Sequence, residues 1–451
     1  MTTSTETTED PVTTRRPDIA LIHCHDLGDW IGCYGWDAVP TPNLDAIAAA
    51  AVVFETAFST SPLCTPARSS LFTGRSPHAN GLMGLTHAGW RYAPGVATLP
   101  ELLAPVGYRT ALLGLQHEDL DARLLGYEEV HGLGFLPRAL EVARLTESWL
   151  AEATDDSRPW FAAIGLWEVH RPWPEEDYTP AEPADVTVPP YLPDNEHTRR
   201  DISRFYGAIA QMDEAVGRIV DAIRAAPGGE ETLVVFTTDH GVAFPGAKST
   251  LYDAGVKVAL VVSPPKSWGV GPGRRAGLVS HLDVVPTLLE LVGQEEPAEV
   301  EGVSFLDHLL TTRSEVPERT LFFEKTYHDR YDPIRGLRTS TAKFIRNFVD
   351  GPRLPLATDL EQSETRSGMG DAHLSARPAE ELYLLDHDPW ESRNVVDDPA
   401  HAALRADLAA RLEEHLRESR DPVLDGDVPP PPPPTSPRTT SRADRIAAGE
   451  G

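Results

Sequence analysis

The chain has 451 residues, of which 41% are hydrophobic and 24% charged, as is ordinary for a soluble globular protein with two or three domains. Its formal net charge of −29 argues against binding to nucleic acid or other long polyanions, because basic surfaces supply most of that affinity. The three cysteines, Cys24, Cys33 and Cys64, cannot all pair and show no CxxC spacing, which argues against a disulfide scaffold.

The amino-terminal segment, residues 1–16, is polar and acidic, and we expect it to be a disordered head. It lacks the apolar run of about 7–15 residues that a secretory signal needs. No run of roughly 18 apolar residues, long enough for a transmembrane helix, occurs in the chain. We therefore expect a cytoplasmic protein with no membrane partner.

From residue 17 the sequence alternates between short apolar runs and segments with apolar residues at helical spacing. Residues 19–23 indicate a buried strand, and Thr41-Pro42 is a helix start signal with Thr as N-cap and Pro at the first helical position. We expect further strands at 110–115, 160–166, 233–237 and 258–262, and further helices at 202–223 and 284–292. The alternation predicts an α/β domain over residues 17–336, with a large, mostly parallel sheet sandwiched by helices.

The character of the sequence changes at about residue 337. Short β-like pieces occur at 343–349 and 381–385, and a last helix carries four leucines on one face: Leu404, Leu408, Leu412 and Leu416. Residues 337–424 therefore predict a smaller C-terminal α+β subdomain. Residues 425–451 are Pro-rich, and we expect an extended, disordered tail.

Histidine and aspartate residues follow four of the expected strands. They are His25 and Asp26, His117, His170, and Asp239 and His240. In open α/β sheets, ligands bind beyond the carboxyl ends of the strands, where such loops meet. One polar strand end is routine, but four together predict a cation site with oxygen and imidazole ligands, or an acid–base site.

A fifth segment carries a more specific signal. Residues 64–68 read C-T-P-A-R, within the longer stretch CTPARSSLFTGR. This stretch resembles the C-x-P-x-R signature of the sulfatase family, in the alkaline phosphatase superfamily. Further resemblance lies in GCYG at 32–35, TPNLD at 41–45 and FTTDHG at 236–241, and it extends over nearly the whole chain between head and tail. Within the family, the chain resembles the sulfamidase-like and related bacterial branch, and the resemblance implies an alkaline phosphatase-like fold and a sulfuric ester hydrolase.

The resemblance implies a chemical role for Cys64. In the family this cysteine is oxidised to formylglycine by a formylglycine-generating enzyme, and the hydrated aldehyde attacks the sulfur of a small sulfated substrate. Arg68 would hold the nucleophile segment and the anion, because a planar guanidinium is a fixed donor. The alternative interpretation is a buried, inert cysteine in an ordinary loop.

The resemblance also implies a divalent cation, usually calcium. Asp26, Asp239 and His240 match family ligands, with Cys64 as the modified residue at the ion, and His25 stands where the family usually has aspartate. Two imidazoles would favour a softer ion such as manganese or zinc. His25 therefore either binds the ion or lies outside its ligand shell.

A second departure concerns Leu115, because the family often has lysine at this position. The resemblance implies that His117 is the base that regenerates the aldehyde, and that His170 and Lys248 bind sulfate and protonate the leaving group. An ordinary histidine pKa near 6.5 suits proton transfer near neutral pH.

Two alternatives to a sulfatase stay open. One is a phosphonate or phosphate ester hydrolase on the same scaffold, since the superfamily shares its geometry. The other is a non-catalytic relative, which the departures at His25 and Leu115 would favour.

Overall fold

The computed structural model describes residues 16–132, 136–153, 156–311 and 318–432, so all but the last residue of the expected disordered head and most of the Pro-rich tail lie outside the described residues. The large sheet is built from β1 (Ile19–Cys24), β2 (Val52–Phe58), β3 (Arg109–Gly114), β4 (Glu129–His131), β5 (Trp160–Gly165), β6 (Leu233–Thr238), β7 (Lys257–Val258), β8 (Leu260–Ser263) and β9 (Gly273–Ser280). The helices before residue 312 are α1 (Pro42–Ala49), α2 (Cys64–Thr73), α3 (Pro77–Asn80), α4 (Leu99–Leu103), α5 (Ala139–Ala153), α6 (Glu196–Ala225), α7 (Asp253–Val256), α8 (Val284–Leu291) and α9 (Leu306–Leu310).

The strands of the large sheet follow the order β4-β3-β5-β1-β6-β8-β2-β7, with β9 paired to β2. The pairs β3–β4, β3–β5, β1–β5, β1–β6 and β2–β9 are parallel, whereas β8 runs antiparallel to both β6 and β2. The α/β class with a large, mostly parallel sheet is therefore confirmed.

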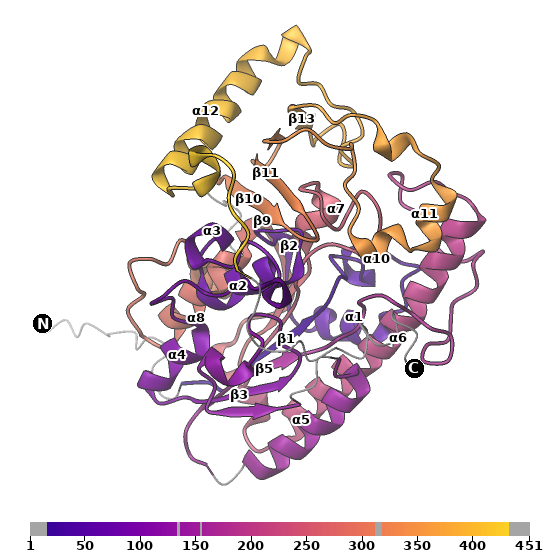
Figure 1. Cartoon of the computed structure of the whole chain (residues 1–451). Helices are drawn as coiled ribbons and strands as arrows, with labels where there is room; N and C mark the ends of the chain where they lie inside the picture. The colour runs from indigo at the N-terminus through magenta and orange to yellow at the C-terminus, as the bar shows by residue number, and fades with distance from the viewer. Residues whose placement is uncertain (1–15, 133–135, 154–155, 312–317, 433–451) are drawn as a thin grey trace, which may run out of the picture.

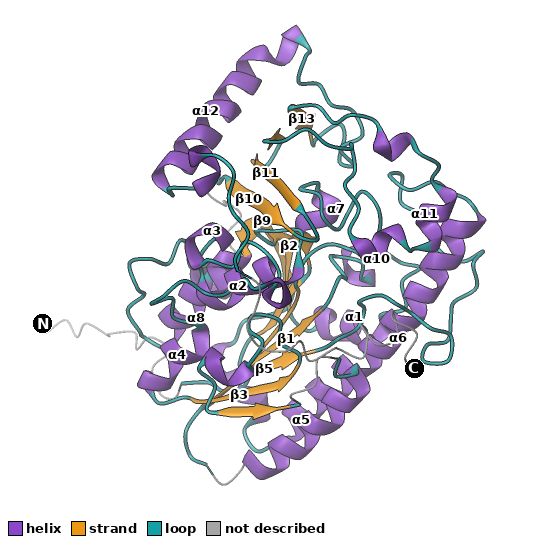
Figure 2. Cartoon of the chain, in the orientation of Figure 1, coloured by secondary structure: helices purple, strands orange, loops and turns teal. Residues whose placement is uncertain are grey.

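Helices cover both faces of this sheet, as Figure 2 shows. Side chains alternate along β1, so that Ala20 and Ile22 join a core with α5 and α6, while Leu21 joins the opposite core with α4 and α8. This two-sided burial explains why β1 reads as a continuous apolar run.

The expected strand at 258–262 is divided into β7 and β8. The interruption is at Ala259, whose amide donates a 3.0 Å hydrogen bond to the carbonyl of Gly28 and not to a neighbouring strand. β2, which the apolar pattern does not predict, lies inside the sheet between β8 and β7.

A second, antiparallel sheet of four strands forms the C-terminal part of the described chain (Figure 1). Its strands are β10 (Leu321–Tyr327), β11 (Tyr331–Arg338), β12 (Ala342–Asn347) and β13 (Glu380–Leu384), accompanied by α10 (Thr358–Glu361), α11 (Glu364–Gly368) and α12 (Ala402–Glu418). This sheet begins at Leu321, before the expected boundary at residue 337. Three of the four leucines in the expected stripe of α12 are buried against the sheet: Leu408, Leu412 and Leu416.

The chain after α12 returns to the large domain. Val428 is buried with Leu82 and Trp90, and its carbonyl accepts a 2.8 Å hydrogen bond from the hydroxyl of Tyr327. The first residues of the expected tail are thus packed against the fold. None of the helices in the described ranges is long and apolar enough to cross a membrane. The cytoplasmic location stays a prediction.

Candidate active site

The central position of β1 brings the expected site residues together. His23 pairs in register with Gly165 of β5 and Thr237 of β6, so the carboxyl ends of the three strands lie level. The loops that follow carry Asp26, His170 and Asp239 to one edge of the sheet, as expected for parallel strands.

Cys64 and Arg68 come to the same place on a helix and not on the loop expected from the sequence. Cys64 is the first residue of α2, and Pro66 is tolerated there because amides in the first turn have no partner within the helix. A spacing of four places Arg68 on the same side as Cys64. The Arg68 guanidinium is fully buried, with Nη1 2.6 Å from His23 Nδ1 and Nη2 3.1 Å from Asp239 Oδ2.

Five buried side chains form a cluster that can hold a metal ion: His25, Asp26, Cys64, Asp239 and His240. One potential ligand atom from each lies within 4.8 Å of all the others. His240 Nε2 is 3.0 Å from Asp26 Oδ1 and 3.5 Å from Cys64 Sγ. His25 Nδ1 is 3.1 Å from Asp239 Oδ2, so the imidazole of His25 faces into the cluster and not away from it.

The hydrogen bonds around the cluster fit a cation. Asp239 Oδ1 accepts hydrogen bonds from the backbone amides of Asp26 (2.9 Å) and His240 (2.8 Å), while the buried Oδ2 lies 3.1 Å from both His25 Nδ1 and Arg68 Nη2. His240 Nδ1 lies 3.0 Å from the carbonyl of Gly241 and donates to it, so a neutral His240 turns the Nε2 lone pair towards Asp26. Two facing lone pairs repel unless a proton or a cation lies between them.

The backbone at the cluster is unusual at one residue. Asp26 has a φ of 52°, in the left-handed region that side chains other than Gly, Asn and Asp rarely adopt. The segment is held by the amide of Val169, which donates a 2.9 Å hydrogen bond to the carbonyl of His25. This left-handed backbone conformation directs the Asp26 side chain into the cluster.

Lys248 and His170 lie beside Asp26. Lys248 Nζ is 2.9 Å from Asp26 Oδ2 and 3.4 Å from His170 Nε2. His170 Nδ1 lies 2.5 Å from the carbonyl of Arg171 and donates to it, so Nε2 is the nitrogen that faces Lys248. Burial, with Lys248, lowers the pKa of His170 to about 4. This pKa is well below the ordinary value expected from the sequence.

His117 approaches Cys64 from the loop after β3. Burial lowers the pKa of His117 to about 4, against the opposing effect of a side-chain hydrogen bond to Cys64. Thr65 donates a 2.7 Å hydrogen bond to the carbonyl of His117, which ties this loop to α2. Leu115, at the position where the family often has lysine, is buried.

The environment of the Cys64 thiol is electropositive. Burial alone would raise its pKa, but His25 and Lys248 outweigh that effect and lower the pKa well below the ordinary value. A thiol at a helix N-terminus among cations is typical of a functional cysteine and not of an inert one.

Sequence reasoning missed two residues at the site. His23 carries no strand-end signal because it lies within β1, yet its Nδ1 contacts Arg68. Asp359 comes from α10, in the irregular connection between β12 and β13, and its Oδ2 is 2.9 Å from Lys248 Nζ. Burial would raise the pKa of Asp359, but Lys248 lowers it below the ordinary value.

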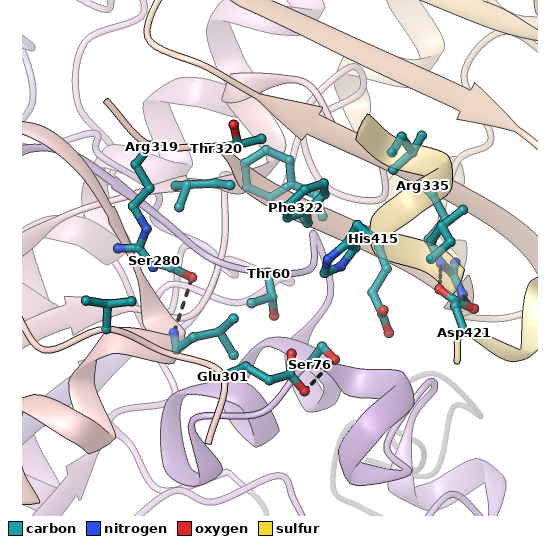
Figure 3. A pocket seen from close by; sticks show the side chains of 17 residues that line it. Thr60, Ser76, Ser280, Glu301, Arg319, Thr320, Phe322, Arg335, His415 and Asp421 are labelled. Carbon is teal, nitrogen blue, oxygen red and sulfur yellow. Dashed lines mark hydrogen bonds and ion pairs between the residues drawn. The ribbon is translucent and has the colours of Figure 1, made fainter. Parts of the chain in front are cut away.

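A separate cavity of about 280 Å³ lies between the large domain and the C-terminal subdomain (Figure 3). Thr60 and Ser76 line it from one side, and Arg335, His415 and Asp421 line it from the other. None of the expected site residues lines this cavity.

The comparisons with known proteins agree with this architecture. Residues 17–294 match the family model for sulfatases. The chain is 29% identical over 469 residues to human N-sulphoglucosamine sulphohydrolase, covering 90% of this chain and 91% of that protein.

Two solved structures show the same fold. One, in complex with its substrate D-glucosamine-2-N,6-O-disulfate, has a TM-score of 0.68 at 16% identity and covers 92% of this chain and 100% of that chain. The other, a phosphonate monoester hydrolase from Silicibacter pomeroyi, has a TM-score of 0.69 at 21% identity and covers 90% of this chain and 96% of that chain. With a family match over more than half of its length, the chain belongs to the sulfatase family.

Proposed function

We propose that this sulfatase hydrolyses a small sulfate ester or sulfamate through a formylglycine made from Cys64 by a formylglycine-generating enzyme. The observation that carries the proposal is the position of Cys64. Cys64 is the first residue of α2, and its side chain lies in the buried cluster with His25, Asp26, Asp239 and His240. When present, formylglycine supplies a hydrated aldehyde whose hydroxyl is the nucleophile towards sulfur.

The same cluster would hold a divalent cation, with His25, Asp26, Asp239 and His240 as ligands beside residue 64. The cation supplies positive charge that polarises the sulfate oxygens. Two carboxylates suit calcium, and the two imidazoles suit manganese or zinc. We expect calcium, with manganese or zinc as the alternative, and a measurement of the bound metal distinguishes them.

The remaining site residues have roles that follow from their contacts. Arg68 fixes Asp239 and the carboxyl end of β1 through two contacts of its guanidinium. Lys248 Nζ presents a positive charge beside Asp26 for the sulfate oxygens. The imidazole of His117 takes the proton from the group at position 64. His170 Nε2 carries no hydrogen when Nδ1 donates to the carbonyl of Arg171, so the proton for the leaving group would come from Lys248 Nζ, 3.4 Å away.

The relatives favour sulfated amino sugars as the first substrates to test. The human relative is named for N-sulphoglucosamine, and one structural neighbour was solved with a glucosamine disulfate. Either S–N or S–O cleavage is compatible with this site. The phosphonate alternative draws on the neighbour from Silicibacter pomeroyi, which shares the fold at 21% identity.

One experiment separates these possibilities. Intact mass is measured first, because conversion of Cys64 to formylglycine removes about 18 Da. Matured protein is then assayed on glucosamine N-sulfate, nitrophenyl sulfate and a nitrophenyl phosphonate ester, with metal content measured alongside. We expect turnover of the sulfated substrates. Faster turnover of the phosphonate would favour the alternative, and a native protein without the mass change would favour a non-catalytic relative.

A further inference from the structure

Asp359 places an acidic side chain at the sulfate end of the site. Its Oδ2 is 2.9 Å from Lys248 Nζ, and its carboxylate lies within 4.8 Å of potential ligand atoms of Asp26 and His170. Asp359 Oδ1 is buried and has no hydrogen-bond partner in the described part of the chain. The side chain as a whole is 21% exposed, so the carboxylate lies at the edge of the site although Oδ1 itself is covered.

The C-terminal subdomain fixes this position. Asp329, in the turn between β10 and β11, accepts a 2.7 Å hydrogen bond from the amide of Thr358. Arg330 in the same turn donates a 3.2 Å hydrogen bond to the carbonyl of Leu356. Leu360, the next residue after Asp359, is fully buried. Contacts of the residues just before and just after Asp359 therefore fix the position of its carboxylate.

A carboxylate beside a sulfate site has an electrostatic consequence. Lys248 is the cation expected to meet the sulfate, and Asp359 repels any anion that approaches it. A substrate that carries a hydrogen-bond donor next to its sulfate offsets this repulsion, because the donor gives Asp359 Oδ1 the partner it lacks. A substrate without such a donor leaves that buried oxygen unpaired.

We propose that Asp359 selects substrates with a hydroxyl or ammonium group adjacent to the scissile sulfate, by accepting a hydrogen bond from that group at Oδ1. This inference rests on the proposed function and adds the chemical class of the leaving group. The substrates are sulfated polyols or amino alcohols such as sugars, and simple aryl sulfates are disfavoured. The subdomain thus supplies a specificity-determining residue to the site.

The test compares three substrates in wild type and two variants. Glucosamine N-sulfate carries neighbouring hydroxyls, 2-aminoethyl sulfate carries an ammonium group, and nitrophenyl sulfate carries neither. For Asp359→Ala we expect the ratio of kcat/KM for either donor substrate to that for nitrophenyl sulfate to fall about 10- to 100-fold. Glu361→Gln, at the end of the same short helix with a side chain 44% exposed, is the matched control and keeps the wild-type ratio.

Asp359→Asn separates the two donors. The amide keeps an acceptor oxygen for a hydroxyl but loses the charge that attracts ammonium. We expect partial recovery on glucosamine N-sulfate and none on 2-aminoethyl sulfate. An unchanged substrate ratio in Asp359→Ala, with all rates falling equally, would mean that Asp359 acts only through Lys248 and would overturn the inference.

A binding measurement keeps the inference testable without turnover. Glucosamine N-sulfate is titrated by calorimetry into the metal-loaded Cys64→Ala protein and into the same protein with Asp359→Ala added. We expect Kd to rise about tenfold or more in the double variant. An unchanged Kd overturns the inference about Asp359, whereas normal binding without turnover in matured wild type counts only against the proposed function.

Discussion

Asp239 offers the sharpest test of the candidate cation site, because its two carboxylate oxygens have separate tasks. Oδ1 accepts hydrogen bonds from the amides of Asp26 and His240, and Oδ2 faces His25 and Arg68 within the cluster. Asp239→Asn keeps an acceptor for both amides but removes the charge. Asp239→Ala removes both the charge and the acceptor.

The difference in stability between the two variants measures the cost of leaving the two backbone amides without an acceptor. Each buried donor left without a partner costs about 1–3 kcal/mol, so Asp239→Ala is expected to be less stable than Asp239→Asn by about 2–6 kcal/mol. For a chain of this size that corresponds to an apparent Tm lower by about 2–7 °C. Both variants lose the charged ligand, so both are expected to lose the bound cation and turnover.

The assay is thermal unfolding of wild type and both variants with chelator and with excess calcium, together with metal content by mass spectrometry. Chelator is expected to lower the Tm of wild type and to leave the variants unchanged, because only a native state that binds the cation is stabilised by it. Equal Tm values for the Asn and Ala variants would refute the hydrogen-bond argument. Wild-type metal content in Asp239→Asn would refute the placement of the cation.

Three further outcomes are expected. Cys64→Ala should abolish turnover of sulfated substrates while its Tm stays within about 2 °C of wild type; measurable turnover in a protein free of wild type would contradict the role of residue 64. His25→Asp should raise the affinity for calcium relative to that for manganese in a competitive titration; an unchanged preference with a raised KM would place His25 at the substrate instead. Burial of His78 lowers its pKa, but the neighbouring Glu324 outweighs this effect and raises the pKa to about 9. The pair therefore stabilises the fold fully below pH 6.5 and progressively less as the pH rises towards 9. His78→Gln should flatten the dependence of Tm on pH in that window, and a wild-type slope in the variant would show that another group titrates there.

Much of the site could be predicted because its residues stand at the ends of apolar strands. The neighbouring strands β1 and β6 are followed by His25 and Asp26 and by Asp239 and His240, respectively. Once the strands are paired, the large separation of these two residue pairs in the sequence no longer matters. Cys64 and Arg68 were found through the specificity of a short motif. That motif predicts which residues act, but not that they begin a helix.

The residues that escaped prediction have no such local signal. His23 points towards Arg68 from within an apolar strand, and its partner is known only once α2 is placed. Asp359 reaches the site because the β10–β11 turn holds its segment, a tertiary contact over a long loop. The division of one expected strand into β7 and β8 likewise depends on the hydrogen bond between Ala259 and Gly28, which links distant parts of the chain.

The pairing of β1 on both sides makes the site sensitive to changes of length and not only of residue type. One residue inserted before His25 would advance Asp26 by about 3.3 Å along the strand and turn its side chain to the other face, while Asp239 stayed in place. The turn between α6 and β6 lies at the opposite end of the strands, so a longer turn there leaves the register of the site residues unchanged. Insertions for labels or fusion partners are therefore better placed in residues 226–232 than near the carboxyl ends of β1, β5 and β6.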